Sequence, residues 1–240
     1  MKVIIILLAV AAVMLPMPAA TYDSLGEAKA LLIRNNSLQS YKKAIELSLA
    51  ALQQQPRSFE VNWVCAKAHW AYADESMRQG VKGWKEICKA YGRKGMDYAE
   101  KAIAINPSRV EGYFWYGCSA GTYSDGAGII DAIREGTRKT QKAFETAYTL
   151  DKMYEDATPV LALGRFWSVL PWPLKDKKKA LVYLEEYHTY FPDNPEGLVY
   201  LAEAYLDVKE KDKARQLLEK ATALDEGYYS NQAGKLLADM

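Results

Sequence analysis

Pairs of amphipathic helical segments joined by short polar turns recur along almost the whole sequence. From Ser24 onward, apolar residues follow at intervals of three and four, the spacing of one helix face, and alternating strand patterns are nearly absent. The clearest pair begins at Asn194-Pro195 and turns at Lys209-Glu-Lys-Asp212. Its small and apolar positions are Leu198, Leu201, Ala202, Tyr205, Ala214, Leu218 and Ala221. This pattern predicts an all-helical chain.

The positions of these residues match the tetratricopeptide unit, a helix pair of about 34 residues. Other pairs end at Gln55-Pro56, Asn106-Pro107, Leu150-Asp151 and Phe191-Pro192. Because a single pair cannot bury its apolar face alone, neighbouring pairs are expected to stack into a continuous superhelix. We predict one all-α tetratricopeptide-type (TPR) solenoid domain over residues 22–240, with about five helix pairs and a C-terminal capping helix near residues 229–238.

Some pairs contain more residues than the unit requires. The extra residues lie around positions 77–95 and 121–136, and we interpret them as insertions in the middle repeats. In the fourth pair, Pro171-Trp172-Pro173 enlarges the turn, because proline ends a helix abruptly. Small residues such as Gly117 and Gly164 are expected to let helix axes approach within about 8–10 Å.

The first twenty residues have the composition of a secretory signal peptide. Lys2 precedes an apolar run over residues 3–14, and Pro16, Pro18, Ala19 and Ala20 follow. The run is shorter than the roughly 20 residues that span a bilayer, although residues 15–20 could lengthen it into an uncleaved inner-membrane anchor, which is the alternative. No second apolar run of that length follows. We predict an exported, periplasmic protein with residues 1–20 as signal peptide and no membrane span after cleavage.

The charge balance argues against a nucleic-acid partner. The chain has 31 basic and 30 acidic residues among 240, so no domain-wide basic surface is expected. Three cysteines, Cys65, Cys88 and Cys118, are an odd number without the spacing of a zinc site, so at least one thiol is unpaired within the monomer. We expect them to pack inside helices.

Catalytic and metal motifs are incomplete. Gly117-Cys-Ser-Ala-Gly121 matches the nucleophile pattern of hydrolases, but that pattern needs a sharp strand-to-helix turn, and here it lies within a helical repeat. Cys65 and His69 share a helix face and supply only two metal ligands. Asp125-Gly-Ala-Gly128 lacks the strand and the Lys-Ser/Thr of a phosphate loop. We predict no enzyme activity, cofactor or metal; a hydrolase using Ser119 is the alternative from another class.

Binding is the favoured function, and the repeat indicates where it occurs. In tetratricopeptide units the second, fifth, ninth and twelfth residues face the concave groove. Our candidate groove residues are Glu111, Phe114, Cys118, Leu161, Arg165, Val199 and Glu203, together with Val61, Val64, Ala68, Ala71, Gly121, Thr158, Ser168, Glu196 and Leu206. This predicts a mostly apolar groove with one central cation.

Arg165 is the cation of this groove, in an otherwise uncharged segment from Ala157 to Leu170. A desolvated guanidinium needs a partner. Either it pairs internally with Glu111 or Glu203, or it holds the carboxylate of an amphipathic ligand or an acidic side chain of a partner protein.

Trp172 is a second candidate, at an interface rather than in the groove. It lies in a turn between two prolines, where we expect it to be partly exposed. An exposed Trp on a rigid turn suits an interface hot spot. Trp172→Ala is therefore predicted to weaken self-association or partner docking while leaving helicity intact.

A family resemblance rests on short motifs in the middle of the chain. They are the stretch from Asn106 to Gly117, Gly128-Ile-Ile, Leu150-Asp-Lys-Met-Tyr154, Leu163-Gly-Arg-Phe-Trp167 and Leu170-Pro-Trp-Pro173. In these the sequence resembles the T-component (TatT-like) family, the periplasmic tetratricopeptide proteins associated with TRAP transporters. The resemblance covers residues 37–225. It departs at Leu174-Lys-Asp-Lys177, where the family often has Gly-Asp, and in lacking a lipoprotein cysteine.

This resemblance implies a helical accessory protein that is not a catalyst. Family members can form trimers, and they are thought to dock the substrate-binding subunit of a TRAP transporter and to pass it a ligand. We therefore expect an exported scaffold that binds a partner protein, with an apolar anionic molecule as a further ligand. The alternative is a general periplasmic scaffold for envelope assembly that recognises peptides and has no small ligand.

Overall fold

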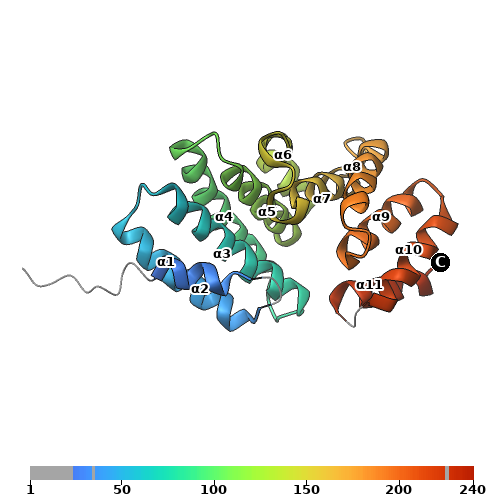
Figure 1. Cartoon of the computed structure of the whole chain (residues 1–240), viewed down its shortest axis with the longest axis horizontal. Helices are drawn as coiled ribbons and strands as arrows, with labels where there is room; N and C mark the ends of the chain where they lie inside the picture. Colours follow the sequence, from blue (N-terminus) through green and yellow to red (C-terminus); the bar gives the residue numbers. More distant parts are fainter. Residues whose placement is uncertain (1–23, 34–35, 225–226) are drawn as a thin grey trace, which may run out of the picture.

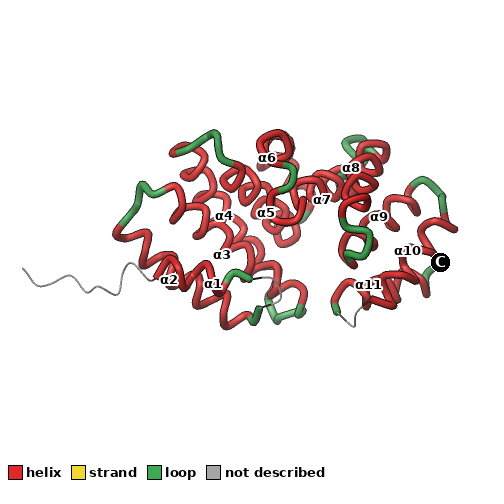
Figure 2. The backbone as a smooth tube through the Cα atoms, viewed as in Figure 1, coloured by secondary structure: helices red, strands yellow, loops and turns green. Residues whose placement is uncertain are grey.

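The computed structural model describes residues 24–33, 36–224 and 227–240, and every regular element in these ranges is a helix (Figures 1 and 2). The helices are α1 (Ser24–Leu31), α2 (Leu38–Gln54), α3 (Phe59–Arg78), α4 (Trp84–Ile105), α5 (Val110–Ala127), α6 (Ile129–Asp151), α7 (Tyr154–Val169), α8 (Lys177–Tyr190), α9 (Pro195–Asp207), α10 (Lys211–Leu224) and α11 (Tyr228–Ala238). The all-helical prediction is confirmed. The predicted signal peptide, residues 1–20, lies outside the described residues.

Consecutive helices pair, and the pairs follow one another along an arch (Figure 1). The pairs are α1/α2, α3/α4, α5/α6, α7/α8 and α9/α10, and α11 packs on the last of them. This is the predicted solenoid of five pairs with a C-terminal cap. On the open side of the arch the end of α3 faces the start of α11.

Side-chain caps explain where several helices begin. The amide of Gly197 donates to the Asn194 side chain at 2.9 Å, and the amide of Lys179 donates to Asp176 at 3.0 Å. These oxygens satisfy amides that the first helical turn leaves without a partner. Helix α7 is the first helix of the fourth pair. It ends at Val169, just before the Pro171-Trp172-Pro173 turn, as predicted.

The extra residues of the middle pairs extend helices instead of forming loops. Helix α3 has 20 residues, α4 has 22, α5 has 18 and α6 has 23, whereas α9 has 13 and α10 has 14. Residue 128 alone separates α5 from α6; it is a glycine with φ 85°, a left-handed value that glycine adopts at little cost. Residues 77–95 and 121–136 are thus largely helical, and the middle pairs are longer than the rest.

The largest core cluster lies in these middle pairs and extends into α7. Trp115, Phe144, Phe166 and Trp167 are buried there, with Trp115 only 1% exposed. Helices α4 and α5 approach closely at Gly92, where a Cβ would lie 2.6 Å from the backbone nitrogen of Tyr123. The core therefore holds the first helices of the middle pairs in fixed positions along the inner face of the arch.

Candidate functional site

A cavity of about 530 Å³ lies in the concave side of the arch. Its lining comes mainly from the first helix of each pair, α3, α5, α7 and α9, and from α11, with additions from the α1 end, α2 and α6. Helices α4, α8 and α10, which the structure describes in full, contribute no lining residue. The first helices thus form the inner surface, as the repeat predicts; we call this cavity the groove.

Packed aromatic side chains form part of the groove wall. The rings of Trp70 and Trp115 lie 5.0 Å apart, and those of Phe114 and Trp115 lie 4.8 Å apart. Phe144 and Phe166 also line the groove and pack edge to face with a ring separation of 6.2 Å. Because these rings belong to the core, they give the groove a rigid apolar surface.

Exposed apolar side chains stand at the rim of the groove. Ile33 is 65% exposed and Val169 is 49% exposed, and both line the cavity. Ile133 of α6 is exposed as well and belongs to the same lining. Apolar side chains gathered around a concavity are typical of a surface that another molecule covers.

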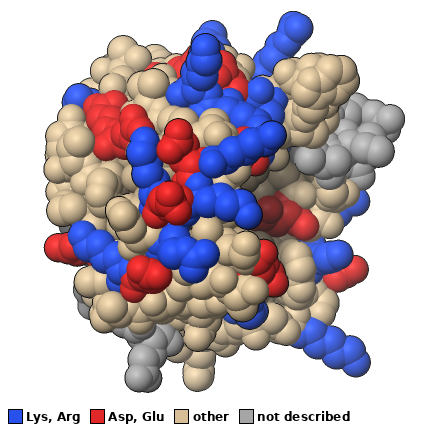
Figure 3. Space-filling view, turned by 90° about the vertical axis from the view of Figure 1, so that its right-hand side faces the viewer, with Lys and Arg blue, Asp and Glu red and all other residues tan. Residues whose placement is uncertain are grey.

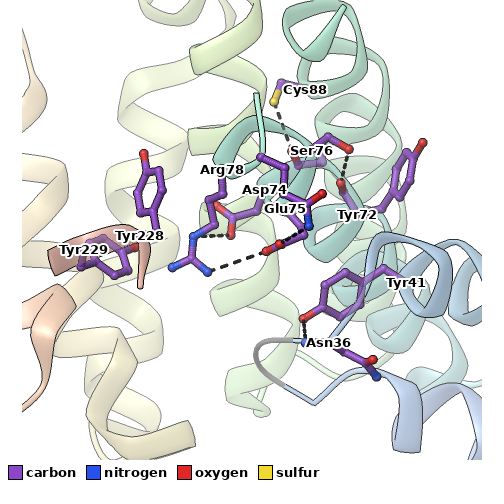
Figure 4. Close-up of polar contacts among 12 residues, drawn as sticks. Asn36, Tyr41, Tyr72, Asp74, Glu75, Ser76, Arg78, Cys88, Tyr228 and Tyr229 are labelled. Carbon is purple, nitrogen blue, oxygen red and sulfur yellow. Dashed lines mark hydrogen bonds and ion pairs between the residues drawn. The ribbon is translucent and has the colours of Figure 1, made fainter. Parts of the chain in front are cut away.

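Arg78 in the last turn of α3 bridges the open side of the arch. Its guanidinium lies 5.3 Å from the ring centre of Tyr228 and 4.9 Å from that of Tyr229, at the start of α11 (Figure 4). It also approaches Asp74 at 3.7 Å and Glu75 at 4.0 Å on its own helix. One side chain therefore joins the second helix pair to the C-terminal cap, which are about 150 residues apart in sequence.

Arg165 of α7 makes the internal pair that was one of its two predicted roles. Its guanidinium pairs with Glu203 of α9 and lies 4.2 Å from the ring centre of Tyr200. The Tyr200 hydroxyl lies 3.2 Å from that of Tyr229. Arg165 thereby belongs to the same network of tyrosines as Arg78, across the C-terminal half of the groove.

The start of α7 carries a third charged pair into the groove. Lys67 Nζ lies 2.5 Å from Glu155 Oε1 and 4.8 Å above the Trp115 ring. Glu155, Asp156 and Ala157 have φ values of 42°, 61° and 57°, a left-handed turn that costs residues with a Cβ about 1–2 kcal/mol each. This turn presents Glu155 to Lys67.

Two carboxyl groups in the groove hold protons more tightly than usual. Partial desolvation by the groove walls raises the pKa of Asp74 to about 7, with Glu196, Asp125 and Glu75 raising it further and Arg78 opposing the rise. The same desolvation raises the pKa of Asp125 to about 6, and Arg165 opposes it. The groove is thus an environment in which negative charge is unfavourable.

The predicted groove residues fall into two groups. Phe114, Cys118, Leu161 and Arg165 line the groove, as do Ala71, Gly121, Thr158 and Glu196. The other eight do not line it. Glu111 is buried and pairs with Arg109, Val199 is fully buried in the core, and Glu203 reaches the groove only through Arg165. The remaining five are Val61, Val64, Ala68 and Ser168, which are buried, and Leu206, which is half-buried. Trp172, the predicted interface residue, is 90% exposed.

The repeat rule missed the charged residues at the helix extensions. Asp74, Arg78 and Asp125 lie beyond its twelfth position, and Tyr228 and Tyr229 belong to the cap. The sequence did contain a signal for the first three, since charged residues follow directly after the mostly apolar or small residues of the repeat positions in two helices.

The residues considered for catalysis or metal binding are packed inside helices. Ser119 is fully buried within α5, so the Gly-x-Ser-x-Gly pattern is helical and does not form the exposed turn that a nucleophile needs. His69 Nδ1 donates to the Cys65 carbonyl oxygen at 2.8 Å, and burial lowers the pKa of His69 to about 4. Within the described ranges no three His, Cys, Asp or Glu side chains form a metal-binding group.

Among the described residues, every helix is too short or too polar to cross a lipid bilayer. Acidic and basic side chains are interspersed over the C-terminal end of the molecule (Figure 3). That face carries no broad area of one sign.

Comparison with protein families gives two matches. The family described as "Regulator of microtubule dynamics protein 1-3" matches residues 26–170, more than half of the chain. The family described as "Tetratricopeptide repeat" matches residues 175–239. No curated protein matches the sequence.

Solved structures share the fold at low sequence identity. TTC0263, a thermophilic TPR protein of Thermus thermophilus, has a TM-score of 0.66 at 18% identity, covering 91% of this chain and 100% of that one. PilF of Pseudomonas aeruginosa has a TM-score of 0.60 at 15% identity, covering 92% and 85%. MamA has a TM-score of 0.51 at 16% identity, covering 82% and 92%. These similarities establish a TPR solenoid; the families found do not include the T-component family.

Proposed function

The chain belongs to the family of regulator of microtubule dynamics proteins 1-3, and from this premise we propose that it is a non-catalytic scaffold whose groove binds a segment of a partner protein. TPR repeats generally bind protein partners and are generally not enzymes. The observation that carries the proposal is the groove itself, with packed aromatic rings in its wall and the exposed Ile33, Ile133 and Val169 at its rim. Concave solenoid surfaces of this kind bind extended ligands.

We further propose that the partner is met in an exported compartment. The support is the signal-type composition of residues 1–20, and the motif resemblance to T-component proteins makes a TRAP substrate-binding subunit the first partner to test. The alternative to a transporter subunit is a cytoskeletal partner, which the description of the matched family suggests. N-terminal sequencing of the protein from fractionated cells separates the two: a mature chain beginning near residue 21 outside the cytoplasm supports export, and an intact Met1 in the cytoplasm contradicts it.

A small anionic ligand is the second occupant to consider. Arg165 would have to exchange Glu203 for the ligand's carboxylate, since its guanidinium is already paired. If such a ligand binds, Arg165→Ala should weaken its binding more than it lowers stability. Unchanged affinity in that variant would remove this role for Arg165.

Trp172 is proposed as a separate contact point, on the turn between α7 and α8. Its 90% exposure is unusual for a Trp and supports an interface role. Trp172→Ala should lower oligomer mass in native mass spectrometry or weaken partner docking without loss of helicity. A change in neither quantity would contradict the interface role.

Site-specific photo-crosslinking tests the scaffold proposal. Benzoylphenylalanine replaces either Val169, at the groove rim, or Val182 of α8, which is 62% exposed and lies outside the groove lining. The two positions are matched in residue type and exposure, so they differ mainly in location. We expect a discrete protein adduct from position 169 and none from position 182. Equal adducts from both positions, or none from position 169, would overturn the proposal.

A further inference from the structure

The charged residues of the groove differ in whether they already have a partner. Its basic lining residues are Lys67, Arg78 and Arg165. Lys67 pairs with Glu155, Arg78 approaches Asp74 and Glu75, and Arg165 pairs with Glu203. Every cation of the described groove lining is therefore engaged within the protein.

One acidic residue has no such partner. Asp125 lines the groove, its side chain reaches solvent, and it forms no hydrogen bond or ion pair with any residue that the structure describes. It also lies in the last turn of α5, where a negative charge opposes the negative end of the helix dipole. Arg165 attracts Asp125 only at longer range, without a hydrogen bond or ion pair between them. Asp125 thus presents to the groove a carboxylate that no described residue contacts directly.

The surroundings of Asp125 strengthen its attraction for a cation. Asp74, Glu75 and Glu196 line the same cavity, so acidic lining residues, five with Asp125 and Glu155, outnumber the three basic ones. Asp74, with its pKa of about 7, carries only part of a negative charge at neutral pH. The carboxyl end of α3 lies at the groove as well, since α3 ends at Arg78. Both helix ends add negative potential to that of the side chains.

The rest of the lining is suited to apolar groups. Phe114, Trp115, Cys118, Phe144 and Phe166 line the cavity together with Asp125. A volume of about 530 Å³ holds a few side chains of a bound segment and not a folded domain. A ligand that contacts both the aromatic residues and Asp125 must therefore combine apolar side chains with a positive charge.

On the basis of the proposed scaffold function, we infer that the groove recognises a partner segment in which a Lys or Arg side chain stands beside apolar or aromatic side chains, with Asp125 binding the cation. The apolar side chains contact the rings of α5 and α7. An acidic segment is disfavoured, because it would place further negative charge beside Asp125 and would have to displace Glu203 from Arg165.

The test selects peptides from a phage-displayed library of random dodecapeptides on the purified full-length chain. Gly121→Trp serves as the variant with an obstructed groove, since Gly121 lines the groove and a Cβ there meets no atom within 4 Å. Peptides that bind the wild-type chain but not Gly121→Trp are groove binders. Circular dichroism and thermal unfolding establish that the variant is folded.

Fluorescence anisotropy then measures the affinity of a synthetic groove-binding peptide for charge variants. We expect enrichment of Lys or Arg beside Trp, Phe or Leu, and about tenfold weaker binding to Asp125→Asn. The matched control is Asp97→Asn, at an exposed position of α4 outside the groove, which should leave affinity unchanged.

The outcomes separate this inference from the scaffold function. Groove-binding peptides without a basic residue, acidic ones included, would overturn the inference and leave the scaffold standing. Unchanged affinity in Asp125→Asn would do the same. If no peptide distinguishes the wild-type chain from a folded Gly121→Trp variant, the scaffold function fails, and the inference fails with it.

Discussion

The middle helix pairs and the last helix pairs use the same repeat for different purposes. Helices α3 to α6 have 18 to 23 residues, whereas α8, α9 and α10 have 13 or 14. The shorter pairs contain little beyond the tetratricopeptide unit. Among the longer helices, the C-terminal parts of α3 and α5 place Asp74, Arg78 and Asp125 in the groove. In this molecule the repeat positions form the framework, and the helix extensions supply half of the charged residues that line the groove: Asp74, Glu75, Arg78 and Asp125.

Packing differs between the two regions as well. At Gly92, α4 meets the backbone of α5, and a Cβ would lie 2.6 Å from Tyr123 N and 2.8 Å from Ser119 O. At Gly164, α7 meets a side chain of α8, and a Cβ would lie 2.5 Å from Leu184 Cγ. A side chain can change rotamer, whereas helical backbone cannot move without shifting the whole helix. The middle of the solenoid should therefore be the less tolerant region.

The largest expected effect comes from adding a methyl group in each region. Gly92→Ala should lower the free energy of unfolding by about 3 kcal/mol and Gly164→Ala by about 1–2 kcal/mol. The cost is higher at Gly92 because the added methyl group meets helix backbone, which cannot move aside as a side chain can. Urea unfolding followed by circular dichroism measures both. The control is Gly234→Ala in α11, where a Cβ meets no atom within 4 Å and alanine should stabilise the helix slightly. A larger loss at Gly164 than at Gly92 would reverse the comparison.

The next effect concerns the side chain that joins the two regions. Arg78→Ala removes the contacts with Tyr228 and Tyr229 and should cost about 1–2 kcal/mol. Small-angle X-ray scattering should also show a larger radius of gyration, because the ends of the arch are no longer bridged. Arg57→Ala, at an exposed turn before α3, is the control for loss of a positive charge. Unchanged stability and dimensions in Arg78→Ala would mean that the two regions are held together without this bridge.

A pH-dependent effect is expected from Asp74. Its pKa is raised from 3.8 to about 7 in the folded chain, so between these values the folded state binds a proton that the unfolded state releases. The contribution of Asp74 to stability therefore falls as pH rises through this range. Relative to wild type, Asp74→Asn should gain in Tm by at least ~2 °C between pH 4 and pH 8.

Thermal unfolding across that pH range measures the Asp74 effect. Asp97→Asn, outside the groove, should show no comparable trend. A constant Tm difference between Asp74→Asn and wild type would show that the Asp74 carboxyl is not desolvated in the groove and that its pKa is not raised.

The smallest effect is expected at the junction between the two regions. Asp156 is exposed and has φ 61°, which glycine adopts with less strain. Asp156→Gly should stabilise the chain by about 0.5–1 kcal/mol. Asp212→Gly in the right-handed helix α10 should destabilise it instead. Opposite signs in a urea titration support the left-handed turn, and a loss of stability at both positions would contradict it.

The sequence predicted the parts of the molecule that depend on local spacing. Leu198, Leu218 and Ala221 are fully buried at the repeat positions that identified the last pair. Trp172 is exposed because neighbouring prolines hold it in a turn after α7. The period of the sequence therefore identified the buried face of the last pair correctly.

The missed features have two causes, which are local side-chain contacts and the curvature of the superhelix. Arg78 meets Tyr229 only because several helix pairs bend the arch until its ends approach, and no local pattern encodes that sum of small rotations. Glu111 was predicted to face the groove, but it turns to Arg109, two residues away. Asp125 was considered only as part of a glycine-rich stretch, because its residues were expected to form an insertion. Sequence reasoning was reliable for the buried apolar positions of the last pair. It failed for some groove positions, such as Glu111, for the extensions of the middle helices, and where distant pairs combine.

Hydrogen exchange of the chain with and without a groove-binding peptide tests the central claim most directly. Mass spectrometry locates the amides that exchange more slowly when the peptide is bound. The account predicts protection in α3, α5 and α7, including the extended ends near residues 74–78 and 121–127, and none in α8 or α10. Protection confined to α8 and α10, or absent from the extended ends of α3 and α5, would contradict it.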